Sequence, residues 1–361
     1  MGGRSLRSSV PSRPDRRSSE DTFRVVRVGR KYPFGRGTVV LMACWLLSAC
    51  TEADVAPRSA LTISGSESDL VGRAALSVVE ERIRVRGDGR EIPAIVMLPD
   101  DYGTRDHYPL VFAIHNFGGG PRRIAGMMEA ERLRKAGNIV VLPQAAGALL
   151  LDWQGPGITL TLARRGEDGR PVNDIVGLTR LYAAVCSLYR IDAHNVNLAG
   201  FSQGATLAFE LARQLELQHA GNVRRLFAVA GSVRALRGEG LYLPQTDIIH
   251  YEPGRNTLQR LANWRTGEPP ETDFIPAILA AKGCALRDRV SADGVDTQIY
   301  ACRDGRSVTR IYEQDGEHAW PGQPADYDIW LLGSGSTSRV KFTDLMIREI
   351  AAPDVQSVAR K

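Results

Sequence analysis

The sequence predicts an α/β protein in which a mostly parallel sheet is covered by helices on both faces. Short, uninterrupted apolar runs recur along the chain, such as residues 110–114, and such runs are typical of strands that are buried on both sides. Segments with helical periodicity lie between these runs, and strands that alternate with helices usually form a parallel sheet. The chain has 361 residues, of which 43% are apolar, so it can bury a substantial core.

The net charge of +5 belongs to the N-terminal segment of the chain. Residues 1–49 carry ten Lys or Arg against three Asp or Glu, a balance of +7, so about −2 remains for all later residues. A basic leader before a nearly neutral remainder is not the electrostatic footprint of a nucleic-acid-binding protein. We therefore expect no nucleic-acid partner.

The segment before residue 50 has the features of an export signal. Residues 37–49 are thirteen uncharged residues that follow Arg30, Lys31 and Arg36, and a short apolar stretch behind positive charge is typical of a signal peptide rather than a membrane span. The segment ends in LSA before Cys50. This ending resembles the bacterial lipobox, which implies a lipid on Cys50 and a membrane anchor, although an ordinary secretory cleavage site is the alternative.

The chain divides into four parts on this reading. Residues 1–49 are a leader, and residues 50–75, which are small, polar and aperiodic, are the lipid anchor and a flexible tether. Residues 76–352 form one α/β domain and residues 353–361 a tail.

The expected elements follow one another in the order that such a domain needs. Alternation around the turn at residues 87–89 predicts an N-terminal hairpin over residues 82–98. Helical periodicity begins at Asp174, which we expect to cap its helix. Further strands are expected at 110–114, 139–142, 196–199, 226–230, 248–249 and 308–312, and helices at 174–189, 203–217, 273–283 and 340–351.

The sharpest motif is GFSQG, from Gly200 to Gly204. A strand pattern precedes it and a helix pattern follows it, which is the setting in which a G-x-S-x-G turn exposes a nucleophilic serine at the end of an α/β-hydrolase sheet. Ser202 is therefore the candidate nucleophile. The alternative is a serine that only caps the helix.

A serine hydroxyl needs a base, and the chain order in α/β-hydrolases is serine, acid, histidine. His250 and His318 follow Ser202 at a useful distance. His250 lies in a strand pattern and reads as a core residue, whereas His318 lies in a loop after the last apolar run. His318 is therefore the candidate base.

The segment HNFGGG, from His115 to Gly120, follows an early strand. Three consecutive glycines free the backbone to bend toward a substrate oxygen, although a flexible turn is the alternative. We expect an oxyanion hole here, formed by the N–H of Gln203 and that of Asn116 or Phe117.

These motifs together resemble the polyhydroxybutyrate depolymerase and feruloyl esterase family of secreted α/β-hydrolases. The resemblance covers about residues 80–325. It implies an α/β-hydrolase fold, Ser202 as nucleophile, His318 as base, and a Cys284–Cys302 disulfide near the histidine loop. The residues that carry it are HNFGGG, Trp153, DIVGL from Asp174, YRID from Tyr189, GFSQG, Gly283-Cys284, Cys302 and GEHAWPG ending at Gly322.

Two positions depart from the family pattern. Asn116 stands where the oxyanion motif has Gly, and Gly254 stands where the family's acid follows its strand. Glu252 is the nearest carboxylate in that loop and is the first candidate for the acid. Asp247 is the second candidate, and an unrelated or absent acid is the third possibility.

The sequence thus predicts an exported serine ester hydrolase that acts on a polyester, a feruloyl ester or an acetyl ester. Its partners would be that ester, polymeric or linked to a plant polysaccharide, and a membrane. The alternative is a non-catalytic lipoprotein that binds sugar or polyester on an esterase scaffold. No cofactor is expected, and no metal site either, since the sequence contains neither CxxC nor HExxH.

Overall fold

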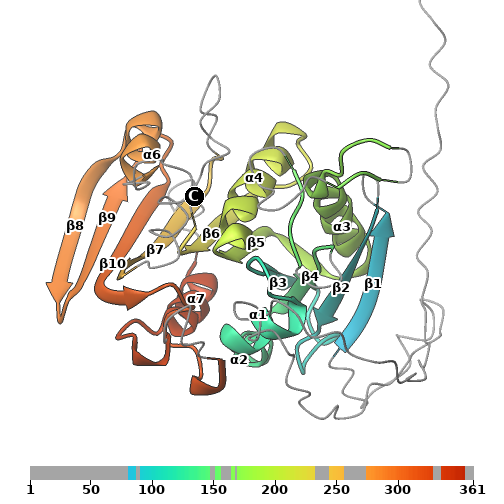
Figure 1. Ribbon diagram of the computed structural model, residues 1–361, viewed down its shortest axis with the longest axis horizontal. Helices are drawn as coiled ribbons and strands as arrows, with labels where there is room; N and C mark the ends of the chain where they lie inside the picture. The colour runs from blue at the N-terminus through green and yellow to red at the C-terminus, as the bar shows by residue number, and fades with distance from the viewer. Residues whose placement is uncertain are drawn as a thin grey trace, which may run out of the picture.

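A computed structural model gives the structure of the protein (Figure 1). It describes residues 80–86, 90–146, 151–155, 164–166, 169–231, 244–255, 274–327 and 335–353. The leader, Cys50 and the tether all lie outside the described residues. Among the residues described, no helix combines the length and the apolar character that crossing a membrane requires.

Ten described strands form one sheet in the order β1-β2-β4-β3-β5-β6-β7-β10-β9-β8. The six strands from β4 to β10 in that order are parallel, and the two strands at each edge pair antiparallel. The mostly parallel sheet and the N-terminal hairpin are thus confirmed. The strands are β1 (Glu80–Arg86), β2 (Glu91–Met97), β3 (Tyr108–Ile114), β4 (Ile139–Pro143), β5 (Ile191–Phe201), β6 (Val223–Val229), β7 (Asp247–Arg255), β8 (Ala285–Ala292), β9 (Val295–Ala301) and β10 (Ser307–Glu317).

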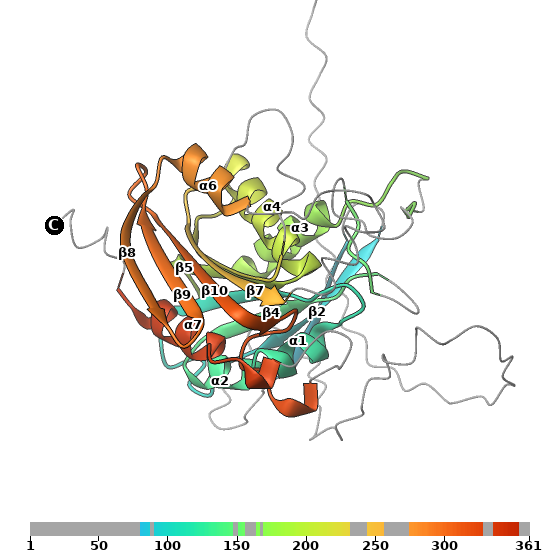
Figure 2. The same ribbon diagram turned by 60° about the vertical axis from the view of Figure 1, so that its left-hand side comes forward.

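Helices cover both faces of the sheet (Figure 2). On one face lie α3 (Asp174–Leu188), α4 (Gln203–Leu217) and α6 (Phe274–Lys282). On the other face lie α1 (Pro121–Met127), α2 (Ala130–Lys135) and α7 (Phe342–Ala351). Two short 3-10 turns, η3 (Ala325–Tyr327) and η4 (Gly335–Thr337), stand between β10 and α7.

The apolar runs are explained by the two cores that the sheet separates. In β3, Leu110, Phe112 and Ile114 belong to the core under α3 and α4, while Val111 and Ala113 belong to the core under α1 and α7. Successive side chains of a strand point to opposite faces, so a strand with a core on each side reads as a nearly continuous apolar run.

Some elements differ from the expectation. The strands β8 and β9 and the helices α1 and α2 were not predicted; β8 is exposed along its whole length and reads ALRDRVSA, without an apolar face. The cap of α3 is Asn173, whose side chain accepts from the N–H of Ile175, and not Asp174. Asp174 is instead buried and receives a hydrogen bond from Arg90 at 2.7 Å.

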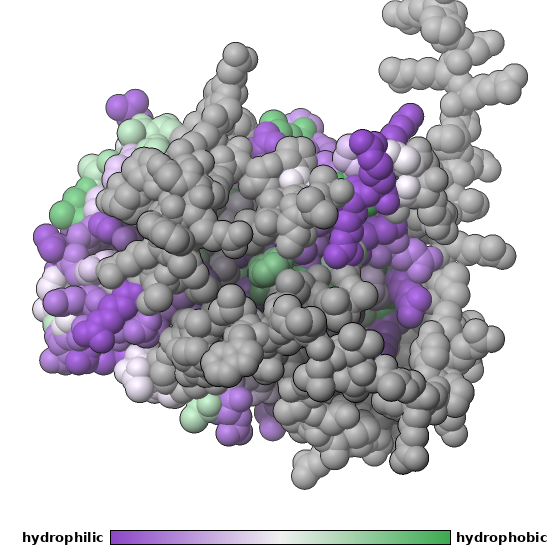
Figure 3. All heavy atoms as spheres, in the orientation of Figure 1, coloured by the Kyte–Doolittle hydropathy of each residue, from purple (hydrophilic) through white to green (hydrophobic). Residues whose placement is uncertain are grey.

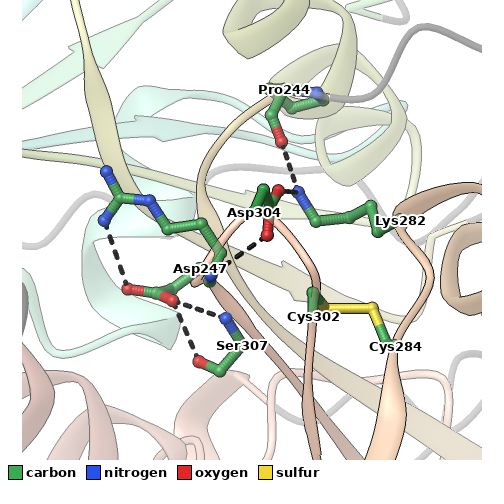
Figure 4. The surroundings of a disulfide bond; sticks show 8 residues. Pro244, Asp247, Lys282, Cys284, Cys302, Asp304 and Ser307 are labelled. Atoms are coloured by element: carbon green, nitrogen blue, oxygen red, sulfur yellow. Dashed lines mark hydrogen bonds and ion pairs between the residues drawn. A yellow bond between two sulfur atoms is a disulfide. The ribbon is translucent and has the colours of Figure 1, made fainter.

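The Cys284–Cys302 disulfide is present (Figure 4). The expectation that it lies beside the histidine loop is wrong. Cys284 follows α6, and Cys302 lies in the turn before β10 begins at Ser307. The bridge therefore stands at the amino end of β10, roughly 30 Å of strand away from His318 at the carboxyl end. Its neighbour Lys282 donates to Asp304 at 2.5 Å and to the carbonyl of Pro244 at 2.9 Å, so this corner joins α6 to the starts of β7 and β10.

Candidate active site

Ser202 stands on a sharp turn between β5 and α4. Its backbone has φ 55° and ψ −121°, a region that residues with a side chain seldom adopt. Strain of this kind persists only where the surroundings enforce it, and it is found at functional sites. Because β5 is a central strand, the turn presents the serine at the carboxyl edge of the sheet.

The two glycines of the motif are required by close packing. A Cβ on Gly200 would lie 2.3 Å from the carbonyl oxygen of Gly204, and a Cβ on Gly204 would lie 2.2 Å from that of Ile114. Any side chain at either position would push α4 away from the ends of β5 and β3. The glycines thus allow the first turn of α4 to touch the loop that follows β3.

His318 reaches Ser202 from the loop after β10. Its Nε2 atom lies 2.9 Å from the Oγ atom of Ser202, although 116 residues separate them in the chain. The imidazole packs on Phe201, with ring centroids 5.2 Å apart. The loop is held by Trp320, which is buried beneath it and whose Nε1 donates to Thr343 on α7 at 3.2 Å.

The charge state of His318 follows from its burial. The ring is buried, and burial lowers its pKa from 6.5 to about 4. The neutral ring has one N–H and one lone pair, and a base for Ser202 needs the lone pair on Nε2, which places the proton on Nδ1. In the part of the chain that the structure describes, Nδ1 has no hydrogen-bond partner.

The structure does not bring either predicted acid to His318. Glu252 accepts from Nε of Arg310 at 2.8 Å, and Asp247 accepts from the backbone and side chain of Ser307, at the amino end of β10. The prediction of Glu252 as the acid therefore finds no support. The sequence near Glu252 does not show that Arg310 lies on the adjacent strand β10, two residues before Tyr312, which is the residue paired with Glu252.

Two carboxylates close to His318 in the sequence also have partners elsewhere. Glu313 is buried and accepts from the hydroxyls of Tyr251 and Ser338, at 2.7 and 2.6 Å. Asp315 pairs with Arg255 at 2.6 Å. Serine and histidine therefore form a pair, without a described carboxylate behind the imidazole.

The two segments predicted to form the oxyanion hole pack against each other, since a Cβ on Gly204 would lie within 2.5 Å of the carbonyl oxygens of Ile114 and His115. Asn116 and Phe117 follow β3 directly, and Gln203 is the first residue of α4. The loop is bent by hydrogen bonds from the side chain of Asn116 to the carbonyl of Phe117 at 2.9 Å, and from the N–H of Gly119 to the carbonyl of Asn116 at 3.0 Å. The first turn of a helix has unpaired backbone N–H groups and a positive partial charge, which favour a developing oxyanion.

Sequence reasoning missed the residues that connect these two donor segments. Asp152, Trp153 and Gln154 form a buried link between the side chain of Gln203 and His115. Trp153 was noted as a part of the family resemblance, but a lone Trp in a loop carries no signal for a hydrogen bond to a carbonyl. Within the described residues there is no group of three or more His, Cys, Asp or Glu that would hold a metal.

Comparison with known proteins gives one match in sequence and several in structure. The profile of the Thioesterase domain family matches residues 149–247, which include β5, Ser202 and α4. Curated proteins give no match.

Three solved structures illustrate the likeness in fold. An acetyl xylan esterase from Aspergillus awamori has a TM-score of 0.45 and 15% identity, over 61% of this chain and 87% of that one. A ferulic acid esterase has a TM-score of 0.36 and 14% identity, over 53% and 86%. An alpha-beta serine hydrolase homologue from Coxiella burnetii has a TM-score of 0.35 and 17% identity, over 53% and 83%.

The strand order, the strained strand-to-helix turn at Ser202 and the serine–histidine contact together form the arrangement of an α/β-hydrolase fold.

Proposed function

We propose that the protein is a serine ester hydrolase that works by double displacement through an acyl-enzyme. The observation that carries this proposal is the 2.9 Å contact between Ser202 Oγ and His318 Nε2 on a strained strand-to-helix turn. A nucleophile and a base within hydrogen-bond reach of each other are the signature of covalent catalysis.

In the first half of the reaction, Ser202 becomes acylated. As Oγ attacks the ester carbonyl, its proton moves to Nε2 of His318, and the carbonyl oxygen becomes an oxyanion. The N–H groups of Gln203 and of Asn116 or Phe117 donate to that oxyanion. The tetrahedral adduct then collapses, the bond to the alcohol oxygen breaks, and His318 returns the proton to the leaving alcohol.

In the second half, water takes the place of the alcohol. His318 removes a proton from the water, the resulting hydroxide adds to the acyl carbon, and the adduct collapses with release of the acid. Ser202 regains its proton from Nε2. Since the buried imidazole titrates near pH 4, it is neutral and ready to act as a base at the start of each half-reaction.

The substrate class and the location that we propose extend the same function. The motif resemblance favours a polyester, a feruloyl ester or an acetyl ester as substrate. The lipobox-like ending before Cys50 favours export and anchoring at a membrane, and exposure outside the cytoplasm fits a disulfide between Cys284 and Cys302.

Labelling with a fluorophosphonate probe tests the proposal. We expect covalent tagging of the wild-type protein, no tagging of Ser202→Ala, and strongly slowed tagging of His318→Ala, together with hydrolysis of a short-chain aryl ester by the wild type alone. An untagged wild-type protein that still binds polyester or sugar would instead establish the non-catalytic lipoprotein.

A further inference from the structure

We propose that Trp153, held by the side chain of Gln203 and by Asp152, is a positioning residue that fixes the two halves of the oxyanion hole relative to each other. This inference rests on the proposed function, since it names how that same site is kept ready for the transition state. The halves come from segments far apart in the chain, the loop after β3 and the start of α4.

The first link runs from α4 to the loop at residues 152–154. The Nε2 atom of Gln203 donates to Oδ1 of Asp152 at 2.6 Å and to the carbonyl of Trp153 at 3.3 Å, and its Oε1 accepts from the N–H of Trp153 at 3.3 Å. The side-chain amide thus pairs with the backbone of Trp153 through both a donor and an acceptor. Because Gln203 also carries the N–H that follows Ser202, its side chain ties this donor to Trp153.

The second link runs from Trp153 to the loop after β3. The indole Nε1 donates to the carbonyl of His115 at 2.9 Å, and the two rings pack with centroids 4.8 Å apart. That carbonyl belongs to the peptide unit whose N–H is on Asn116. A hydrogen bond to it therefore sets the orientation of the peptide that presents an oxyanion donor.

His115 completes the path, and its tautomer is determined by its partners. Its Nε2 accepts from the N–H of Ala145 at 3.0 Å, so Nε2 has the lone pair and Nδ1 has the proton. Nδ1 then donates to the carbonyl of Asn116 at 2.7 Å. Burial lowers the pKa of His115 to about 4, which keeps this neutral arrangement at ordinary pH.

Residues 152–154, which connect Gln203 to His115, are also held by hydrogen bonds to residues outside the site. Asp152 also accepts from Nε2 of Gln154 at 3.1 Å, and the N–H of Gln154 donates to Asp174, which Arg90 holds at 2.7 Å. The side chains of Asp152, Trp153, Gln154 and His115 are all almost completely buried. Hydrogen bonds in such a dry environment are stronger than in water, and their partners are expensive to leave unpaired.

Such an arrangement matters for rate more than for substrate binding. An oxyanion donor stabilises the tetrahedral adduct more than the flat ester, so a displaced donor lowers kcat while KM changes little. The Trp153→Phe variant removes one N–H and keeps an aromatic ring against His115. We expect it to lower kcat on p-nitrophenyl acetate about 10- to 100-fold, with KM within about 3-fold of wild type.

A matched control is Tyr108→Phe, at the opposite end of β3. Tyr108 is as fully buried as Trp153, and its hydroxyl donates to the carbonyl of Asp101 at 2.5 Å and accepts from Thr104 and Arg105. This variant also loses buried hydrogen bonds, but away from the catalytic edge. We expect it to lower stability without changing kcat or KM.

The experiment measures kcat, KM and the affinity for phenylboronic acid, which forms a tetrahedral adduct with an active serine. Wild type, Trp153→Phe, Gln203→Met, their double variant and Tyr108→Phe are compared, with thermal unfolding of each. We expect boronate affinity to fall with kcat in Trp153→Phe and Gln203→Met, and the double variant to be little worse than the worse single one, because both break one path.

Two results would overturn the inference. In the first, Trp153→Phe behaves like Tyr108→Phe, losing stability but keeping kcat and boronate affinity; the indole is then only a packing residue, and the proposed function stands. In the second, the wild type neither hydrolyses esters nor binds the boronate, and the proposed function falls together with the inference.

Discussion

The two sides of the active site are built differently. On the nucleophile side, Ser202 is held by a strained turn, and buried hydrogen bonds connect Gln203, Trp153 and His115. On the base side, His318 is held by packing on Phe201 and by its bond to Ser202, while its Nδ1 has no partner among the described residues. Hydrogen bonds thus hold the segments of the proposed oxyanion hole, whereas the described residues give the Nδ1 side of His318 no such support.

The difference has a consequence for the reaction. A carboxylate at Nδ1 would orient the imidazole and stabilise the imidazolium that forms when Ser202 gives up its proton. Since no carboxylate of the described residues lies at Nδ1, we expect the stabilisation of the transition state to depend more heavily on the proposed oxyanion hole. Variants on each side can separate the two contributions.

The largest effect is expected from removing either member of the catalytic pair. Ser202→Ala and His318→Ala should each lower kcat/KM on an aryl ester by at least about 10⁴-fold, and the double variant should be no worse than either single one, since nucleophile and base act as a unit. Steady-state kinetics on the three variants test this. Wild-type rates in Ser202→Ala would show that Ser202 is not the nucleophile and would contradict the proposed function.

The next largest effect concerns the nucleophile side. In Gly204→Ala, the new Cβ would meet the carbonyls of Ile114 and His115 at 2.2 and 2.5 Å, so α4 must move away from the β3 loop. We expect roughly 3 kcal/mol lower stability and about 100-fold lower kcat. Urea unfolding and kinetics measure both quantities. An unchanged kcat in a folded Gly204→Ala variant would show that contact between these segments is not needed.

Reduction of the disulfide tests whether the position of His318 depends on the distant Cys284–Cys302 bond. Because the bridge lies at the opposite end of β10 from His318, its reduction should lower stability by roughly 3 kcal/mol for a loop of 18 residues and leave kcat unchanged. Thermal unfolding and activity with and without reductant measure this. A parallel loss of kcat in protein that remains folded would mean that the bridge positions the histidine loop after all.

The smallest effect is expected at Glu252. Its carboxylate pairs with Arg310, with Nη2 at 2.7 Å, and both side chains are partly exposed, so Glu252→Gln should change kcat/KM by less than about 3-fold. The same assay as for His318→Ala provides the comparison. A loss of about 100-fold or more would restore Glu252 as the acid.

Much of the fold could be read from the sequence because its signals are local. The apolar runs of β3 to β7 and the periodicity of α3 and α4 identify these elements, since each is buried along a complete face. The strand β8 lacks such a signal because it is an exposed edge strand, and α1 and α2 are too short to show a period.

Only those parts of the site that lie in recognisable motifs could be predicted from the sequence. The turn at Ser202 and the loop at His318 could be predicted because both contain glycines and both follow a strand. Hydrogen-bond partners that are distant in the chain could not be predicted. Nothing near Glu252 in the sequence indicates Arg310, and nothing near Gln203 indicates Asp152. Whether the disulfide lies at the amino or the carboxyl end of β10 depends on the direction of that strand, and the spacing of the cysteines does not indicate it.

The pH dependence of kcat/KM tests the central claim most directly, namely that His318 acts as a base with no carboxylate of the described residues at its Nδ1 atom. Burial alone sets its pKa at about 4, so the neutral base should persist, and kcat/KM should stay level between about pH 5.5 and 8 and fall only as the pH drops toward 4. Buried histidines with lowered pKa values also destabilise the fold below about pH 6.5, because the unfolded chain then binds more protons; circular dichroism at each pH must therefore show folded protein. A level profile with its acid limb near pH 4 is the result we predict. An acid limb well above pH 6.5 in folded protein would contradict it, since a negative partner at Nδ1 raises the pKa of an imidazole above its ordinary value.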